Sequence, residues 1–181
     1  MRKIFTLALL VFAVILIPGA AFNHSAGAGL DTTKNAAVSY YICSVCGHVE
    51  LSPVSKPCQV CNAPAEKYTQ NDRIFEESAE EFKDASIKHI PVIKVTKKCG
   101  LIPEAPCVDI IVRIGTVLHP MEPDHYIQFV DCYVDNAFVE RVTLTPAVYA
   151  AGYFHLKSKG TKVLIIEKCS IHGYWKNDAK L

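Results

Sequence analysis

Five potential metal ligands, spread over residues 89–172, constrain the fold of this chain more than any other feature. They lie in three short motifs, which are Lys88-His89-Ile90-Pro91, His119-Pro120-Met121-Glu122-Pro123-Asp124-His125 and Cys169-Ser170-Ile171-His172. Each motif alone is weak, because a single histidine is more often a surface or core residue than a ligand. Together, four imidazoles and one thiolate can bind one transition metal and leave one octahedral position open for chemistry. A fold that forms this site must bring distant segments together.

Composition sets broad limits on the protein. Its 181 residues are 50% hydrophobic and 20% charged, which fits one medium domain or two small ones rather than a disordered chain. The formal net charge is +1, and no basic run interleaved with aromatic residues occurs. We therefore expect no nucleic-acid partner.

Residues 1–28 predict a secretory signal peptide. Arg2 and Lys3 precede the apolar run 4–17, and small residues offer cleavage sites after Ala21 or Ala28. The run is short for a membrane span, which needs about 20 apolar residues, although an uncleaved anchor is the alternative. Residues 23–37 predict a flexible tether. We expect an exported, periplasmic or otherwise extracytoplasmic protein, membrane-tethered if the leader is retained.

Residues 72–181 predict a mostly β domain. Apolar residues alternate with their neighbours through Val108, Ile110, Val112 and Ile114, as a sheet with one buried face requires. Turn residues separate six β-prone runs, which are 90–95, 108–117, 126–134, 138–144, 153–156 and 162–167. This pattern favours an antiparallel β-sandwich. The preceding charged segment 71–86 has Phe75, Ala79 and Phe82 at helical spacing and predicts a helical link.

Residues 39–70, called the front module below, contain two cysteine pairs, Cys43-x-x-Cys46 and Cys58-x-x-Cys61. Two such knuckles can place four thiolates around one metal, and this doubled spacing is far more specific than one Cys-x-x-Cys. Two disulfides are the alternative in an oxidising compartment. Tetrahedral sulfur sites suit both iron and zinc, so the metal stays open between them.

Three further cysteines lie outside these motifs. Cys99 and Cys107 bracket a proline-containing loop between two predicted strands. In an exported protein a disulfide between them is plausible, and two free, buried thiols are the alternative. Cys132 lies within a predicted strand and is expected to be a small core residue rather than a ligand.

The front module resembles the short rubredoxin-like domain of rubrerythrins. The resemblance rests on Tyr40-Tyr41-Ile42-Cys43-Ser44-Val45-Cys46-Gly47-His48 and on Pro57-Cys58-Gln59-Val60-Cys61-Asn62-Ala63-Pro64. It implies a one-electron iron centre with four cysteine ligands. In the desulforedoxin domain the two cysteines of the second pair are adjacent in sequence, whereas Cys58 and Cys61 are separated by two residues. The module is therefore closer to rubredoxin than to desulforedoxin.

The later motifs, continued by Tyr126-Ile127 and Gly173-x-Trp175, resemble the superoxide reductases, also called desulfoferrodoxins and neelaredoxins. The resemblance covers residues 72–181 and implies an immunoglobulin-like β-sandwich. It also implies an iron with His89, His119, His125 and His172 as equatorial ligands and Cys169 as the axial ligand. Lys88 would guide superoxide and support proton delivery. The implied reaction reduces superoxide by one electron to hydrogen peroxide, with an external donor such as rubredoxin, and a homo-oligomer is left open.

One residue departs from the family pattern. Family members commonly carry Glu immediately before the Lys-His pair, and this Glu can occupy the sixth coordination position of the oxidised iron. This chain has Ile87 instead. We expect water, hydroxide or an external anion to take that position. Turnover should survive, because Lys88 and all five ligands are present.

Two other classes of function compete with an enzyme. One is a non-enzymatic rubredoxin-like electron carrier in which the second metal site is structural. The other is a zinc-loaded binding module without a redox role. A structural zinc site is normally closed by four ligands, so five ligands with an open position favour the enzyme.

Overall fold

The computed structural model describes residues 38–97, 107–157 and 159–181. The predicted signal peptide (1–28) and tether (23–37) lie outside these residues. Within the described ranges, no helix has the length and apolar character needed to cross a membrane.

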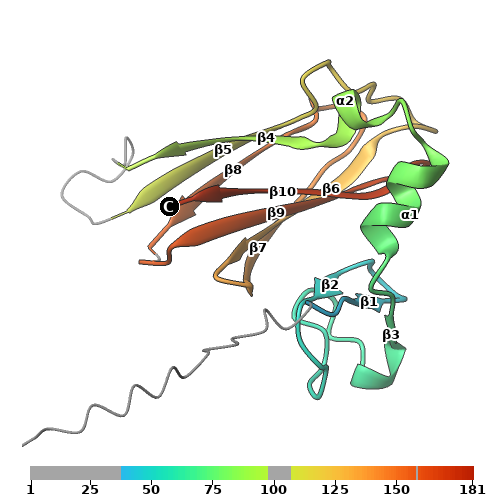
Figure 1. Cartoon of the computed structure of the whole chain (residues 1–181), viewed down its shortest axis with the longest axis vertical. Coiled ribbons are helices and arrows are strands. Elements are labelled where there is room, and N and C mark those ends of the chain that lie inside the picture. The colour runs from blue at the N-terminus through green and yellow to red at the C-terminus, as the bar shows by residue number, and fades with distance from the viewer. Residues whose placement is uncertain (1–37, 98–106, 158) are drawn as a thin grey trace, which may run out of the picture. The chain divides into compact units, whose positions relative to one another are not determined.

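Antiparallel strands form the two sheets of a β-sandwich, with orders β10-β9-β6-β7 and β4-β5-β8 (Figure 1). The predicted antiparallel β-sandwich is thereby confirmed. The strands are β4 (Pro91–Thr96), β5 (Val108–Ile114), β6 (Ile127–Val134), β7 (Ala137–Thr143), β8 (Ala151–Leu156), β9 (Lys162–Cys169) and β10 (Gly173–Lys180).

Side chains of both sheets meet in one apolar core. In β5, Ile110, Val112 and Ile114 are fully buried, whereas Ile111 between them is 44% exposed. This confirms the predicted alternation. Cys132 is a free, fully buried cysteine in the same core, as expected from its strand position.

Strand β10 is not among the six strands expected after residue 89. It pairs with β9 along its whole length and forms one edge of its sheet. Only Tyr174 and Trp175 are buried in it, so no apolar alternation marks the rest. The predicted run 108–117 was also too long, because Gly115, with φ of +77°, follows the last residue of β5.

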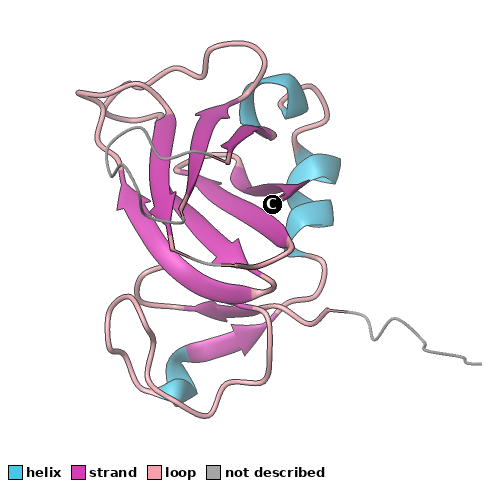
Figure 2. Cartoon of the chain, turned by 90° about the vertical axis from the view of Figure 1, so that its left-hand side faces the viewer, coloured by secondary structure: helices cyan, strands magenta, loops and turns pink. Residues whose placement is uncertain are grey.

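Two short helices lie beside the strands of the sandwich (Figure 2). These are α1 (Ile74–Glu81) and α2 (Ser86–His89). The predicted helical link is present, and its buried residues differ at one position from the three at helical spacing. Phe75 and Ser78 are buried, whereas Ala79 is exposed. The Ser78 hydroxyl oxygen accepts a 3.0 Å hydrogen bond from the backbone N–H of Tyr174, which ties α1 to β10.

The front module contains a small sheet of order β2-β1-β3. Its elements are β1 (Tyr41–Cys43), β2 (Val49–Glu50), a 3-10 helix (Ala65–Lys67) and β3 (Tyr68–Gln70). Tyr40 and Val49 of the module pack against Tyr133, Ile166 and Tyr174 in a second apolar core. The two central strands of this sheet, β6 and β9, are therefore covered on both faces, which explains why nearly all of their residues are buried.

A buried network of charges also joins the front module to this sheet. Arg141 donates to both carboxylate oxygens of Asp131, at 2.6 and 2.7 Å, and to the backbone carbonyl of Cys46 at 2.9 Å. His48 lies 3.1 Å from Asp131 and 3.2 Å from Glu50. The side chains of Asp131 and His48 are fully buried. The network places two cations against two carboxylates and so balances its charges.

The pKa of His48 predicts how stability depends on pH. Burial lowers this pKa, but the hydrogen bonds to Asp131 and Glu50 outweigh burial and raise it to about 9. Because the folded pKa is raised, the stabilisation is complete below the unfolded pKa and is lost as pH rises through the folded value. Between about pH 7 and pH 10 we expect a loss of about 2–3 kcal/mol in the free energy of unfolding. Denaturant unfolding of the metal-loaded protein measures this loss. Equal pH slopes in the wild type and His48→Gln would contradict the assignment.

Candidate metal centres

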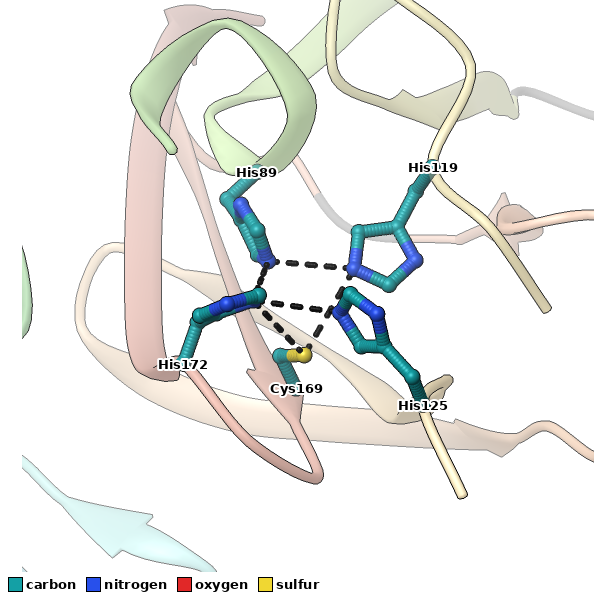
Figure 3. Close-up of side chains that lie close together, drawn as sticks. All are labelled: His89, His119, His125, Cys169 and His172. Carbon is teal, nitrogen blue, oxygen red and sulfur yellow. Dashed lines mark hydrogen bonds between the residues drawn. The ribbon is translucent and has the colours of Figure 1, made fainter. Parts of the chain in front are cut away.

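The five predicted ligands of the rear site, His89, His119, His125, Cys169 and His172, converge although they come from different elements (Figure 3). His89 ends α2, and Cys169 ends β9. His119 and His125 lie in the connection between β5 and β6, and His172 lies in the turn between β9 and β10. The ligand atoms of the five residues all lie within 4.8 Å of one another.

Three distances between neighbouring histidine nitrogens are those expected for the edges of a square. His89 Nε2 lies 3.0 Å from His119 Nε2 and 3.1 Å from His172 Nδ1, which lies 3.1 Å from His125 Nε2. A square with an edge of 3.0 Å has its centre about 2.1 Å from each corner, the usual bond length from a histidine nitrogen to a metal such as zinc. The spacing therefore fits one metal at the centre.

Hydrogen bonds on the far side of the rings explain why this spacing needs a cation. His89 Nδ1 donates to the carbonyl of Ala85 at 2.7 Å, and His119 Nδ1 donates to the carbonyl of Pro120. In each neutral ring the Nε2 atom then carries a bare lone pair. Two such lone pairs face each other across 3.0 Å and repel unless a cation lies between them. The donor set therefore fits a metal ion.

Cys169 supplies a fifth ligand from one side of the square. Its Sγ lies 3.5 Å from His119 Nε2 and 3.6 Å from His172 Nδ1, and the residue is 1% exposed. A cavity of about 370 Å³ borders the site and is lined by Phe82, Asp84, Lys88 and the ligands His89, His125 and His172, among others. The rear site thus combines a buried thiolate with access for a small molecule.

Burial sets the protonation of the ligands. Burial lowers the pKa of His89 to about 4, despite the hydrogen bond to Ala85. Burial, reinforced by His89, also lowers the pKa of His119 to about 4. Both imidazoles are therefore neutral at pH 7 and ready to bind metal. Burial raises the pKa of the Cys169 thiol, so metal binding must displace its proton.

Two aromatic residues support the rear ligands. The Trp175 ring stacks on His89 with centroids 5.1 Å apart, and its Nε1 donates to the carbonyl of His172. Phe82 contacts His172 edge-on at 4.7 Å. Trp175 stood in a predicted motif without an assigned role, and Phe82 was expected only as part of a helix face. No sequence signal pointed to either contact.

The four cysteines of the front site, Cys43, Cys46, Cys58 and Cys61, also converge. All four are free, so the alternative of two disulfides is not what the structure contains. The sulfurs of Cys43 and Cys61 lie 3.7 Å apart, and those of Cys46 and Cys58 lie 3.6 Å apart. A regular tetrahedron with an edge of 3.7 Å has its centre about 2.3 Å from each corner, the length of a zinc–sulfur bond.

Turns of the backbone build both knuckles of the front site. The N–H of Gly47 donates to the carbonyl of Cys43 at 2.8 Å, and the N–H of Asn62 donates to that of Cys58 at 2.9 Å. Gly47 and Asn62 both have positive φ, 72° and 59°. Four thiolates in this arrangement fit iron or zinc.

Only one of the two cysteines of the predicted Cys99–Cys107 disulfide lies within the described residues. Cys107 is buried and disulfide-bonded. Cys99 lies outside the described residues, so the pairing stays a prediction.

Comparison with known proteins identifies the family. A family model described as desulfoferrodoxin matches residues 81–178. The chain is 29% identical over 140 residues to the desulfoferrodoxin of Syntrophotalea carbinolica, covering 76% of this chain and 94% of that protein. It is 30% identical over 138 residues to a desulfoferrodoxin homolog of Archaeoglobus fulgidus, covering 76% of this chain and 94% of that protein.

A third relative carries the name of an enzyme. The superoxide reductase of Pyrococcus horikoshii is 30% identical over 106 residues, which covers 52% of this chain and 87% of that protein. The family match spans α2, the sandwich except the last two residues of β10, and all five ligands of the rear site. On its sequence and on the geometry of this site, the chain belongs to the desulfoferrodoxin family.

Proposed function

We propose that this protein is a superoxide reductase, which reduces superoxide by one electron to hydrogen peroxide. The observation that carries the proposal is the rear site, where four imidazoles and one thiolate converge beside an accessible cavity. The relative from Pyrococcus horikoshii named superoxide reductase supports it. These five residues would hold an iron ion, which would supply the one electron that, with one superoxide and two protons, gives one hydrogen peroxide.

The chain's own residues prepare the site for a small anion. Neutral His89 and His119 do not cancel the charge of a bound cation, which therefore attracts superoxide. Lys88 is exposed and lines the cavity, so its ammonium adds positive charge where the anion enters. The buried Cys169 thiolate donates electron density from the ligand sphere and favours the oxidised state of iron.

The stoichiometry of the products tests the proposal. The iron-loaded protein is supplied with reduced rubredoxin as electron donor and with a steady source of superoxide. A reductase forms one hydrogen peroxide per superoxide, consumes donor and evolves no oxygen. Dismutation would form one peroxide for two superoxides and evolve oxygen, and would overturn the proposal. An inert rear site would leave a rubredoxin-like electron carrier.

Replacing Lys88 by Gln should slow the reaction with superoxide by about tenfold, because the entry of the anion loses a positive charge. The rate is measured by rapid mixing at several salt concentrations. Lys88→Arg should restore most of the rate and its salt dependence. Lys94→Gln removes the same charge from an exposed residue that does not line the cavity, and should change little. Equal changes of the rate in Lys88→Gln and Lys94→Gln would show that Lys88 does not guide superoxide to the site.

Because Ile87 stands where family members carry Glu, we expect the oxidised rear site to accept an external anion. Its side chain is 54% exposed and does not line the cavity. Added azide should therefore shift the absorption of the oxidised protein. An unchanged spectrum would contradict this and point to a carboxylate of the chain, of which Glu81 and Asp84 line the cavity.

We further propose that the protein acts outside the cytoplasm and receives electrons from an external donor such as rubredoxin. The apolar run 4–17 after two basic residues supports export. Comparing the amino terminus of the protein from membrane and soluble fractions distinguishes a cleaved leader from an anchor. The open rear cavity supports an external donor, and a homo-oligomer can be tested by light scattering.

A further inference from the structure

Lys168 lies between the two metal sites. It precedes the rear ligand Cys169 in β9, but successive side chains of a strand point to opposite faces. Cys169 belongs to the core of the sandwich, whereas Lys168 faces the front module. A Cβ atom built on Gly47 would lie 3.4 Å from Lys168 Nζ. The ammonium group is therefore beside the turn that follows Cys46.

The side chain of Lys168 is partly buried in this position. It lines a cavity of about 500 Å³ together with Cys43, Cys46 and Gly47, among others. Its Nζ lies 5.3 Å from the centroid of the Tyr174 ring, which is the cross-strand neighbour. The methylene chain of Lys168 thus packs on the Tyr174 ring, while its ammonium group stays close to the front site.

No carboxylate pairs with Lys168 among the residues that the structure describes. This sheet has two buried carboxyl groups. The oxygens of Asp131 are already taken by Arg141 and His48. Glu167 precedes Lys168 in β9, so its side chain points to the opposite face of the sheet. A partly buried cation without a counter-ion is costly, so its position needs a compensating negative charge.

We propose that Lys168 is the counter-charge of the front four-cysteine centre and favours the reduced state of iron held there. Four thiolates and Fe(III) carry one net negative charge, and an added electron makes it two without forming or breaking a bond. A nearby cation stabilises the doubly charged state more than the singly charged one. This inference goes beyond the proposed rear-site reaction, since it concerns the redox equilibrium of the front centre.

A redox titration of the full-length, iron-loaded protein tests the proposal. The absorption of the front Fe(III)–thiolate centre is followed at controlled potentials for the wild type, Lys168→Gln and Lys168→Arg. At the potential where the wild-type centre is half reduced, Lys168→Gln should show an Fe(II)/Fe(III) ratio about three- to tenfold lower. Lys168→Arg keeps the charge and should stay within about twofold of the wild type.

Lys162→Gln is the matched control, because it removes the same charge from the other end of β9, where Lys162 pairs with Asp178 at the surface. Its ratio should equal that of the wild type. Lys168→Met keeps the packing on Tyr174 and repeats the test if the Gln variant folds poorly. Unchanged ratios in both neutral variants, equal shifts at Lys162, or a front site that takes only zinc would overturn the proposal. Superoxide is absent from this titration, so failure of the proposed enzyme activity would leave it unaffected.

Discussion

Replacing Asp131 by Ala should lower the free energy of unfolding by about 3–5 kcal/mol, because it leaves buried charges without their partner. Asp131 is fully buried, and both of its oxygens accept hydrogen bonds from Arg141. His48, also fully buried, loses its 3.1 Å contact in the same variant. The loss should detach the front module from the sheet as well as destabilise the sandwich, since Arg141 also holds the carbonyl of Cys46.

Denaturant unfolding of the metal-loaded protein at neutral pH measures this loss. The matched control is Asp178→Ala, whose carboxylate forms an exposed pair with Lys162 at 3.4 Å. Exposed pairs contribute little, so the control should change stability by less than about 1 kcal/mol. Asp131→Asn should lie close to Asp131→Ala, because the amide keeps the shape but not the charge. Similar small losses in both Ala variants would show that the network does not stabilise the fold.

Replacing Cys169 by Ser should abolish the thiolate-to-Fe(III) absorption of the rear site. It should also reduce the rate with superoxide by about two orders of magnitude or more. A serine hydroxyl is a harder and less acidic ligand than a thiol, so it neither binds the metal as tightly nor donates comparable electron density. Absorption of the oxidised protein and rapid mixing with superoxide give the two readouts.

Cys132→Ser is the matched control for this prediction. Cys132 is also a fully buried, free cysteine of the same core, but it does not belong to the rear site. The change should cost about 1–3 kcal/mol of stability through burial of a hydroxyl and should leave the rear absorption in place. A Cys169→Ser protein that keeps the absorption and the rate would show that Cys169 is not a ligand.

The cysteines of the front site could be predicted because their spacing is local and specific. The rear ligands lie in three motifs that are weak alone, and they were predicted because the order and spacing of these motifs resemble those of the superoxide reductases. Cys169-x-x-His172 lies in one turn, and each Cys-x-x-Cys lies in one knuckle. The strands of the sandwich core were equally visible, since burial on one face of β5 imposes an alternation. Strand β10 gave no such signal, because it lies at the edge of the sheet and its two buried residues, Tyr174 and Trp175, are adjacent rather than alternating.

The contacts around the sites could not be predicted, because they depend on tertiary packing. His48 meets Asp131 across 83 positions of sequence, and each alone resembles an ordinary polar residue. Ser78, rather than Ala79, faces the sheet because Tyr174 offers it a backbone N–H. A lysine such as Lys168 is expected at the surface from its residue type. It becomes partly buried beside the front site only when the front module packs on β9.

The most direct measurement is the metal content and visible absorption of protein purified without oxygen, before and after stoichiometric superoxide. We expect iron in the rear site, a new thiolate-to-Fe(III) band after superoxide is added, and hydrogen peroxide without evolved oxygen. Zinc in the rear site, or an unchanged spectrum, would contradict the assignment of the five ligands to a superoxide-reducing iron centre.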